Sequence, residues 1–599
     1  MNYNTHMKKK PENDSAGDIL GINPGHDATV VLIRNGTVLI SLSEERLTRK
    51  KHHEGFPFRA LEYVKNKYNP KNPKVFIVGS KPIKAFMKEP PTSGRFVRKY
   101  SRNARAVFIG TPILKNFLMF YDRAIEEWSA RVSMKKYDEF LKQQLQGLEY
   151  QLVNHHQCHA WASLAFSHQN TSEQLIFTLD GSGDGISGSI NIFDGKSIEV
   201  KHTFSMSQSI GFLYASVVDL LGMSRLEHEY KVMGLAPYAK VSVGEKAYEE
   251  LKKMIWFEPK TMELHSTFDM AWATSNLISK DFNLRHRFDA IAYGVQKLTE
   301  EIIKDIVRAA IEKYKINDIS LGGGVFMNVK ANQYLSELSE VSSIVITPSC
   351  GDESLALGAA VFGYSQQNGG DLSNLKQVDN LYLGTEYSDE EIKDFIDNYS
   401  VAQKWKIDFY PPQKTKTIET VVAELLSKNK IVARFKGRAE WGARALGNRS
   451  ILANPSSQEN VKVINEMIKG RDFWMPFAPS LLYEDRSRYL ENPRDLYAPF
   501  MAITFNTKSA LRNEIIATVH PYDSTSRPQM VKKEINPTYH TLISQFKKKT
   551  GIGAILNTSF NLHGEPNVEN PYDALRTFEL SGLSHLAIGN YLCSKIQES

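Results

Sequence analysis

The chain has 599 residues, of which 42% are hydrophobic, 11% aromatic and 24% charged. This length exceeds what one hydrophobic core supports and the composition is that of a globular protein, so at least two domains are expected. The net charge of +7 is small for this length and does not indicate nucleic acid as the main partner, and no apolar run reaches the roughly 18 residues of a membrane span.

The start of the chain and its cysteines both favour a cytoplasmic protein. Residues 1–18 are polar and contain no apolar signal-peptide segment, so we expect a flexible lead. The three cysteines, Cys158, Cys350 and Cys593, are too few and too scattered for a disulfide framework or a CxxC metal knuckle. Neither a membrane nor a nucleic acid is expected as a partner.

The N-terminal half contains two similar groups of predicted strands. In each group, a strand runs into a polar glycine loop, a second strand follows, and a tight turn leads to a third strand. The predicted strands cover residues 19–22, 28–33 and 37–41 in the first group, and 175–179, 186–193 and 197–203 in the second. This repeat predicts two similar lobes. The pattern resembles the actin and sugar-kinase (ASKHA) superfamily, in which two such loops face each other across a nucleotide cleft.

Two stretches of the N-terminal half lie outside this repeat. Residues 80–145 are rich in lysine, arginine and aromatic residues, and we interpret them as a solvated helical insertion without assigned chemistry. Residues 289–314 carry apolar residues at helical spacing, followed by a strand near 319–321 that runs into Gly322, Gly323 and Gly324. Three glycines either let backbone N–H groups approach a phosphate or simply allow a tight turn.

Four polar residues of the N-terminal half form a candidate metal site. His155 and His159 are four residues apart, so on a helix their imidazoles share one face. Asp180 follows a buried strand, and Asp352 lies in a glycine loop between a strand and a helix. The alternative is that both histidines are ordinary packed or solvated residues and that Asp352 caps the helix.

A polar, glycine-rich break at 366–374 predicts a domain boundary near 365–380. Beyond it, Lys436, Arg438, Arg444 and Arg449 occur within fourteen residues together with three glycines. Guanidinium groups match phosphate oxygens and glycines remove obstruction, so this segment predicts an anion site; structural ion pairing is the alternative. Polar clusters containing Arg527, and Asn557 with Ser559, follow.

Ten motifs, in family order from residue 19 to about 580, resemble the O-carbamoyltransferases of the nodulation protein U and tobramycin carbamoyltransferase type. They occupy residues 25–28, 44–52, 155–159, 179–185, 231–238, 322–328, 351–352, 441–454, 475–479 and 557–566. The resemblance implies an α/β chain with two modules. A duplicated ASKHA domain would cover 19–370, with the insertion at 80–145, and a YrdC-like domain would cover 380–599.

The resemblance also implies a function for each module. The YrdC-like domain would use carbamoyl phosphate and ATP with Mg²⁺ to form carbamoyl adenylate and pyrophosphate. The ASKHA domain would pass the carbamoyl group to a hydroxyl of a small natural-product or sugar acceptor. Such chemistry makes sense because a mixed anhydride with AMP is open to attack by an alcohol, and a cation would stabilise the developing charge.

Site residues follow from the same resemblance, position by position. An iron-type divalent ion would be held by His155, His159, Asp180 and Asp352, although manganese and zinc fit the same ligands. The nucleotide would be lined by Gly322, Gly323, Gly324, Asn328, Asn557 and Ser559, and phosphates would be held by Lys436, Arg438, Arg444, Arg449 and Arg527. His26, next to Asp27, is the candidate base for the acceptor hydroxyl, or else it shapes its loop.

The sequence departs from the family pattern in three places. Ala443 stands where proline is expected, residues 520–523 replace a smaller turn, and the insertion at 80–145 is long. The first two changes should alter loop stiffness, and the third indicates a different acceptor. A small-molecule kinase of the ASKHA type and a factor like the tRNA threonylcarbamoyltransferases are the alternative functions, and a homodimer is expected from the size.

Overall fold

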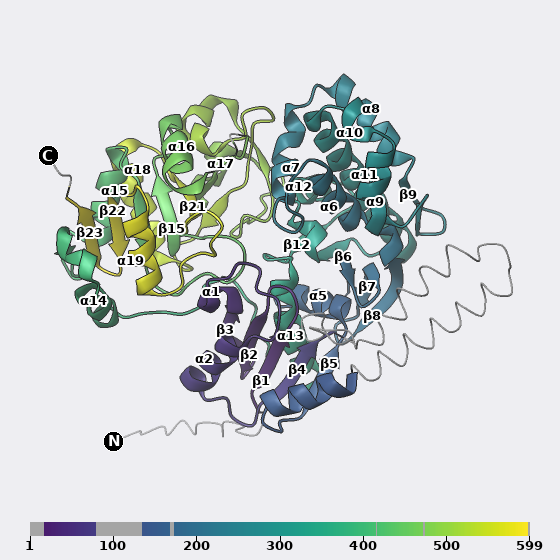
Figure 1. The fold of residues 1–599 in the computed structure, drawn as a ribbon, viewed down its shortest axis with the longest axis horizontal. Helices are drawn as coiled ribbons and strands as arrows, with labels where there is room; N and C mark the ends of the chain where they lie inside the picture. The colour runs from purple at the N-terminus through teal and green to yellow at the C-terminus, as the bar shows by residue number, and fades with distance from the viewer. Residues whose placement is uncertain are drawn as a thin grey trace, which may run out of the picture.

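The computed structural model describes residues 17–79, 134–167, 173–414, 416–470, 472 and 474–596 (Figure 1). All but the last two residues of the predicted lead, and residues 80–133 of the predicted insertion, lie outside the described residues. Of the insertion, residues 134–144 are helical, and Tyr137 and Leu141 are buried in the first lobe. Among the helices described, none has the length and apolar character needed to cross a bilayer.

The first lobe is a five-stranded sheet in the order β3-β2-β1-β4-β5. β1 to β3 are antiparallel, and the turn between β2 and β3 contains Asn35 and Gly36, both at positive φ, as a two-residue hairpin requires. β4 lies parallel to β1, and β5 parallel to β4. The strands are β1 (Ile19–Asn23), β2 (Thr29–Arg34), β3 (Thr37–Ser43), β4 (Lys74–Val78) and β5 (Tyr150–Val153).

The second lobe repeats this topology. Its sheet has the order β12-β11-β6-β7-β8, with β6 to β8 antiparallel and β11 and β12 parallel to β6. The strands are β6 (Gln174–Gly183), β7 (Ile186–Phe193), β8 (Ile198–Ser205), β11 (Asp318–Gly322) and β12 (Ser343–Ile346). The predicted duplication is therefore confirmed. The predicted helix at 289–314 is also confirmed as α11 (Phe288–Tyr314), whose apolar stripe is buried against α8 (Val241–Lys252).

The two lobes exchange a helix. α5 (His155–Leu164) follows the last strand of the first lobe but packs on β6 and β11 of the second. α13 (Leu355–Gln367) follows the last strand of the second lobe but packs on β1, β2 and β4 of the first. The two helices also pack against each other between the sheets (Figure 1). This exchange brings the ends of β1, β5, β6 and β12 to one place.

Gly358 permits the close packing of the exchanged helices. A Cβ atom at this position would lie 1.7 Å from the carbonyl oxygen of Cys158. We expect Gly358→Ala to lower the free energy of unfolding by about 1–3 kcal/mol, because the helices must separate to admit the methyl group. Urea unfolding followed by circular dichroism measures this change.

Gly234 provides the matched control for this substitution. It lies in α7 (Glu229–Leu235), where an added Cβ would meet Trp474 O at 3.6 Å, an ordinary contact. Gly234→Ala is therefore expected to raise stability by up to about 1 kcal/mol through helix propensity. Equal effects of the two substitutions would show that the helix contact is not tight.

The C-terminal half is an α/β domain with a mixed sheet in the order β13-β23-β22-β14-β15-β21-β16-β20. α15 (Ile418–Ser427) and α18 (Pro537–Thr550) cover one face, and α14 (Asp389–Asp397) and α19 (Pro571–Leu580) cover the other. The α/β fold is as predicted, and the finer likeness to YrdC stays a prediction. The strands are β13 (Trp405–Phe409), β14 (Val432–Phe435), β15 (Arg449–Ala453), β16 (Ala478–Leu482), β20 (Gln529–Val531), β21 (Ala554–Ser559), β22 (His585–Ile588) and β23 (Tyr591–Lys595).

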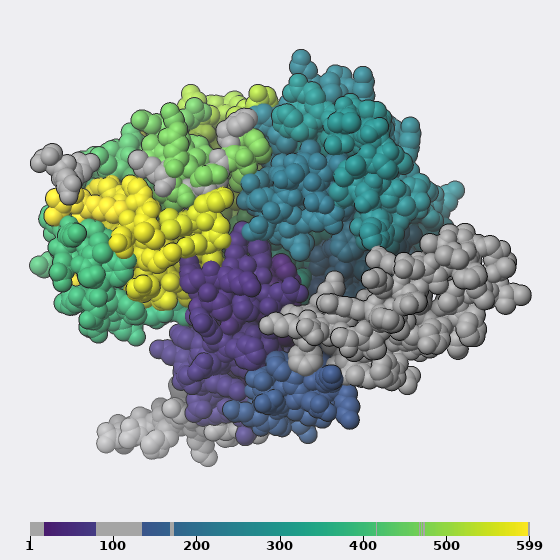
Figure 2. Space-filling model, viewed as in Figure 1, coloured from purple at the N-terminus to yellow at the C-terminus, as the bar shows by residue number. Residues whose placement is uncertain are grey.

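The C-terminal domain contacts both lobes. On the first lobe, α1 (Glu44–Thr48) is followed by Arg49, which donates to the carbonyl oxygens of Pro566 and Asn567. On the second lobe, Lys330 lies 2.7 Å from Asp523. Figure 2 shows the first lobe, in purple, meeting the yellow end of the chain on the visible face. The C-terminal domain therefore packs against both lobes.

Candidate functional site

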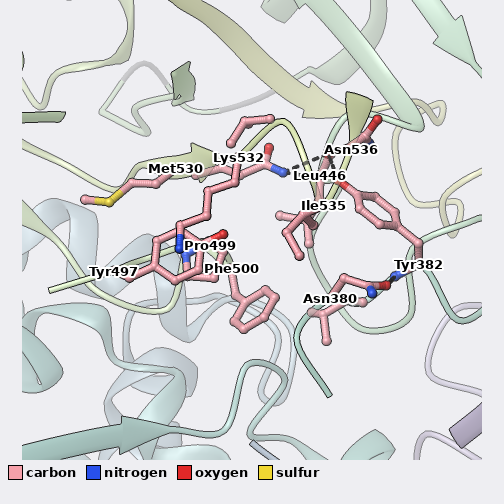
Figure 3. Close-up of a pocket in the computed structure, with 13 residues that line it drawn as sticks. Asn380, Tyr382, Leu446, Tyr497, Pro499, Phe500, Met530, Lys532, Ile535 and Asn536 are labelled. Carbon is pink, nitrogen blue, oxygen red and sulfur yellow. Dashed lines mark hydrogen bonds between the residues drawn. The ribbon is translucent and has the colours of Figure 1, made fainter. Parts of the chain in front are cut away.

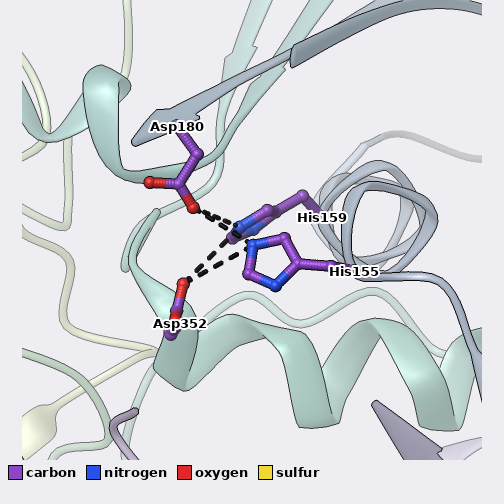
Figure 4. A group of neighbouring side chains, drawn as sticks. All are labelled: His155, His159, Asp180 and Asp352. Atoms are coloured by element: carbon purple, nitrogen blue, oxygen red, sulfur yellow. Dashed lines mark hydrogen bonds and ion pairs between the residues drawn. The ribbon is translucent and has the colours of Figure 1, made fainter. Parts of the chain in front are cut away.

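Four of the predicted site residues converge where the lobes meet (Figure 4). His155 and His159 come from the first two turns of α5, which begins after the side chain of Asn154 caps its N-terminus. Asp180 comes from β6, and Asp352 from the loop between β12 and α13. The helix exchange therefore places ligands from both halves of the duplication around one point.

The distances within this cluster suit a single bound ion. His155 Nε2 and His159 Nε2 each lie 3.2 Å from Asp180 Oδ2, and they lie 3.7 and 3.9 Å from Asp352 Oδ1. Nitrogen and oxygen ligands bound at about 2.1 Å stand about 3.4 Å apart in a tetrahedron. The donor set and its spacing therefore fit a divalent transition metal.

Neighbouring groups fix the orientation of these ligands. His159 Nδ1 lies 3.3 Å from Ser354 Oγ, and Asp180 Oδ1 accepts a hydrogen bond from the N–H of Gly181. Two glycines also make room, because a Cβ at Gly183 would lie 2.1 Å from the His155 ring and one at Gly324 would lie 2.9 Å from Asp180 Oδ1. Such support is typical of metal ligands.

The electrostatics of the cluster favour a cation. Burial lowers the pKa of His159, while for His155 burial is outweighed by the carboxylates of Asp352 and Asp180, which raise its pKa to about 9. Burial alone would raise the pKa of Asp180, yet hydrogen bonds with both histidines hold it well below its usual range. Burial raises the pKa of Asp352 to about 7. Two acids this close need a shared counter-charge.

A second cluster contains His26, Asp27 and His52. Asp27 Oδ2 lies 2.8 Å from His26 Nδ1, Asp27 Oδ1 lies 2.9 Å from His52 Nδ1, and the two imidazoles stack with centroids 5.3 Å apart. The hydrogen bond with Asp27 raises the pKa of His26 to about 9. Burial lowers the pKa of His52, but its bond to Asp27 outweighs burial and raises it. Nε2 of His26 does not take part in this pairing.

Asn23, at the end of β1, ties the two clusters together. Its Nδ2 donates to the carbonyl oxygen of His26 at 2.8 Å and to that of Asp352 at 2.9 Å. The carboxylates of Asp352 and Glu353 also contribute to the raised pKa of His26. Asn23 therefore holds His26 and Asp27 beside the four-residue cluster.

The triple glycine turns tightly around β6. Gly323 has φ of +94°, and a Cβ there would lie 2.3 Å from the carbonyl oxygen of Leu179, while one at Gly322 would lie 2.9 Å from that of His159. Asn328 caps α12 (Val329–Ser336) by accepting from the N–H of Ala331, and it exchanges hydrogen bonds with Gln296. Close packing explains the glycines, and a nucleotide role for these residues stays a prediction.

In the C-terminal domain, most donors of the predicted phosphate-binding residues face protein atoms. The cationic loop, residues 436–449, holds Lys436 against Glu419 and Asn590, and Arg438 against the carbonyl oxygens of Leu39, Leu383 and Gly384. Arg449 is fully buried, and its NH1 and NH2 donate to carbonyl oxygens that include those of Gly437 and Thr385. Burial lowers the pKa of Arg449 to about 10.

The remaining predicted residues occupy two other places. Arg444 lies in the cationic loop, and Arg527 lies between the short strand β19 (Thr525–Ser526) and β20. Asn557 is buried on β21, where its Nδ2 donates to Ala445 O and Ser480 Oγ, and Ser559 donates to Asn561. The structure therefore brings the four metal-type ligands together but distributes the phosphate and nucleotide candidates over several contacts.

A small, partly open pocket lies in the C-terminal domain (Figure 3). Tyr382, Tyr497, Phe500 and Lys532 are among its lining residues, and Lys532 Nζ lies 4.1 Å from the Tyr497 ring centroid. Of the predicted site residues that the structure describes, none lines it. It is therefore separate from both histidine clusters.

Three residues beside the clusters were not singled out from the sequence. His52 shares Asp27 with His26, Asn23 joins the clusters, and Glu353 lies next to Asp352 with burial raising its pKa to about 7. His52 and Glu353 stand inside or beside family motifs, so their place in those motifs was an available signal. The partner of Asn23 is 329 positions away, so spacing in the sequence gives no signal for Asn23.

Comparison with known proteins covers nearly all of the chain. Residues 18–361 match the family model described as carbamoyltransferase N-terminus, and residues 423–595 match the one described as carbamoyltransferase C-terminus. An uncharacterised protein of Methanocaldococcus jannaschii is 32% identical over 97% of this chain and 100% of its own length. Nodulation protein NolNO of Sinorhizobium fredii is 29% identical over 95% of this chain and 79% of its own.

A relative with a named reaction matches over a shorter span. The 3′-hydroxymethylcephem-O-carbamoyltransferase of Amycolatopsis lactamdurans is 27% identical over 49% of this chain and 52% of its own length. Among solved structures, full-length HypF matches with a TM-score of 0.32 and 14% identity, over 59% of this chain and 56% of its own, so the strand order rather than this likeness supports the fold assignment. The two family models, in sequence on one polypeptide, establish that the chain is an enzyme belonging to the carbamoyltransferase family.

Proposed function

We propose that this carbamoyltransferase is an ATP-dependent O-carbamoyltransferase with two sites, the C-terminal domain (380–599) activating the carbamoyl group and the N-terminal domain (19–370) transferring it. The observation that carries the proposal is the ordered match to both family models, joined in the N-terminal match by four converging ligands. The name of one relative, 3′-hydroxymethylcephem-O-carbamoyltransferase, specifies a hydroxymethyl acceptor. A small hydroxylated molecule is accordingly the proposed acceptor here.

Activation would take place at the cationic loop. Carbamoyl phosphate would lose its phosphate with uptake of one water, and the carbamate oxygen would attack the α-phosphorus of ATP. The products are carbamoyl adenylate, inorganic phosphate and pyrophosphate. Backbone and side-chain donors of residues 436–449 would hold the phosphate oxygens, and Mg²⁺ would accompany ATP. The proposed contribution of Lys436, Arg438, Arg444 and Arg449 is to keep this loop positively charged and shaped, and Arg527 is a proposed phosphate-binding residue outside the loop.

Transfer would take place at the four-residue cluster. His155, His159, Asp180 and Asp352 would hold one divalent ion, with iron(II), manganese(II) and zinc(II) all suited to two imidazoles and two carboxylates. When bound, such an ion supplies positive charge that stabilises the oxyanion formed on the carbamoyl carbonyl oxygen. The glycines at 322–324, with Asn328, Asn557 and Ser559, are the proposed nucleotide-side residues.

The second cluster would remove the proton of the acceptor. His26 Nε2 takes the hydroxyl proton as the alcohol oxygen attacks the carbamoyl carbon and AMP leaves. Asp27 holds Nδ1 of His26 and stabilises the imidazolium that forms, while His52 fixes the other carboxylate oxygen of Asp27. Asn23 keeps this pair aligned with Asp352.

The proposal predicts a specific product pattern from the purified enzyme. With ATP, Mg²⁺ and carbamoyl phosphate, we expect carbamoyl adenylate, pyrophosphate and phosphate, with pyrophosphate release falling to background when carbamoyl phosphate is omitted. Enzyme-coupled pyrophosphate detection with chromatography of the nucleotides measures this. Formation of ADP together with a phosphorylated acceptor, independent of carbamoyl phosphate, would instead identify a kinase.

A further inference from the structure

Arg46 is a buried arginine at the junction of the N-terminal and C-terminal domains. It lies on α1 of the first lobe, is 6% exposed, and its NH2 donates to the carbonyl oxygen of Gly442 in the cationic loop at 2.9 Å. Its Nε stands 3.6 Å from Glu45 Oε1. Its NH1 is buried and has no hydrogen-bond partner among the described residues. Burying a charged N–H group without a hydrogen-bond acceptor costs free energy, and a bound acceptor would remove that cost.

Arg449 presents a second donor of the same kind. Its Nε is also buried without a partner among the residues described, although its NH1 and NH2 are satisfied. The charge of Arg46 contributes to the lowered pKa of Arg449, so the two guanidinium groups lie close enough to repel each other. Glu440 does not satisfy them, because its Oε1 accepts three backbone N–H groups and its Oε2 has no donor. Arg46 NH1 and Arg449 Nε are thus two buried cationic donors without an acceptor among the described residues.

Arg49, three positions after Arg46, has hydrogen-bond partners for both of its terminal guanidinium nitrogens. Its NH1 donates to the carbonyl oxygen of Asn567 and its NH2 to that of Pro566, each at 2.7 Å. Asp573 and Glu565 lie at 3.5 and 3.7 Å. Arg49 therefore serves the domain interface, whereas Arg46 reaches the same interface with part of its donor capacity unused.

Arg46 lies between the two proposed sites, the cationic loop and the four-residue cluster. Gly442, which accepts from Arg46, is followed by Ala443, whose N–H donates to Ser349 Oγ at 3.2 Å. Ser349 in turn bonds to Glu353, the neighbour of Asp352. A chain of contacts therefore runs from Arg46 through the cationic loop to the loop of a proposed metal ligand.

We propose that Arg46 binds a phosphate oxygen of the substrate held by the cationic loop, so that the N-terminal domain completes the anion site of the C-terminal domain. This inference rests on the proposed function, because it takes the cationic loop as the activation site. The shared chemistry is a phosphate oxyanion, which carbamoyl phosphate and a nucleotide both carry. Arg46 would then be a binding residue supplied across the domain junction.

Isothermal titration calorimetry of the full-length protein tests this assignment, with inorganic phosphate, carbamoyl phosphate and AMP as separate ligands. We expect Arg46→Lys to weaken binding of at least one of them by about tenfold to a hundredfold, because a charge-assisted hydrogen bond is lost. A selective effect on phosphate and carbamoyl phosphate identifies the donor substrate, and one on AMP identifies the nucleotide. Arg46→Gln keeps a donor for the Gly442 carbonyl oxygen but has no charge, and it should weaken binding of the same ligand as Arg46→Lys does.

Arg49→Lys is the matched control. It should lower the melting temperature by loosening the interface while leaving each affinity within about twofold of wild type. Unchanged affinities in both folded Arg46 variants would overturn the inference. An equal loss in the Arg46 and Arg49 variants would also overturn it, since it would show a general effect of the interface. Failure of the wild type to release pyrophosphate with carbamoyl phosphate would instead reject the proposed function, so the two failures are distinguishable.

Discussion

Replacing Asp180 by asparagine is expected to abolish carbamoyl transfer while carbamoyl adenylate still forms. Asp180 Oδ2 stands 3.2 Å from both His155 Nε2 and His159 Nε2, so a neutral amide removes the charge at the centre of the ligand set. We expect bound metal to fall to background and transfer to drop about 1000-fold, as a loss of about 4 kcal/mol of charge stabilisation implies. Elemental analysis measures bound metal, pyrophosphate release measures carbamoyl adenylate formation, and mass spectrometry of the product measures transfer.

Asp184→Asn is the control for this experiment. Asp184 lies in the same loop, and its Oδ2 accepts from the backbone N–H of His155 at 2.9 Å. This variant should keep its metal and most of its transfer activity. If Asp180→Asn retained both metal and transfer, the four residues would not form the metal site. Loss of pyrophosphate release in Asp180→Asn would show that activation and transfer do not take place at separate sites.

Replacing His26 by alanine is expected to slow transfer by about 10²–10⁴-fold without loss of metal, the usual contribution of a positioned base. The pH dependence gives the sharper test. The hydrogen bond with Asp27 raises the pKa of His26 to about 9, so the neutral form that accepts a proton increases as the pH rises. The wild-type transfer rate should therefore climb about tenfold per pH unit through neutrality and level off near pH 9. Single-turnover assays with preformed carbamoyl adenylate isolate this step.

The variant and its control distinguish a base from a residue that shapes the loop. His26→Ala should lose the rising limb altogether, whereas His53→Ala should keep it, because His53 contacts Thr48 and not Asp27. A rising limb that persists in His26→Ala would assign the proton transfer to another group. His26 would then serve only to shape its turn.

The sequence predicted the parts of this molecule that depend on local order. Strand, glycine loop and hairpin recur in both lobes, so the duplication could be predicted from periodicity and turn residues alone. The convergence of the four ligands was also predictable, because the spacing of His155 and His159 fixes one helix face and Asp180 follows a buried strand. The family resemblance then placed Asp352 with them.

Other features depend on contacts that spacing does not encode. Arg438 and Arg449 suggested a phosphate cradle, yet their donors mostly meet carbonyl oxygens, since a buried guanidinium must satisfy each N–H. Asn23 and Asp352 are separated by 329 positions, and Arg46 and Gly442 by 396. The first pair exists only after the two lobes have packed together, and the second only after the two domains have. His52 meets Asp27 through a backbone turn at positive φ that its sequence does not signal.

The exchanged helices also bear on how this polypeptide must be made. One face of the first sheet is covered by α13, which ends at Gln367, so the earliest 150 residues leave the ribosome with that face bare. The β-strands that form first must wait for more than two hundred further residues before their burial is complete, and pairings this distant fold slowly. Fragments ending between the two lobes should therefore aggregate, and chaperones should bind the nascent chain until α13 has emerged.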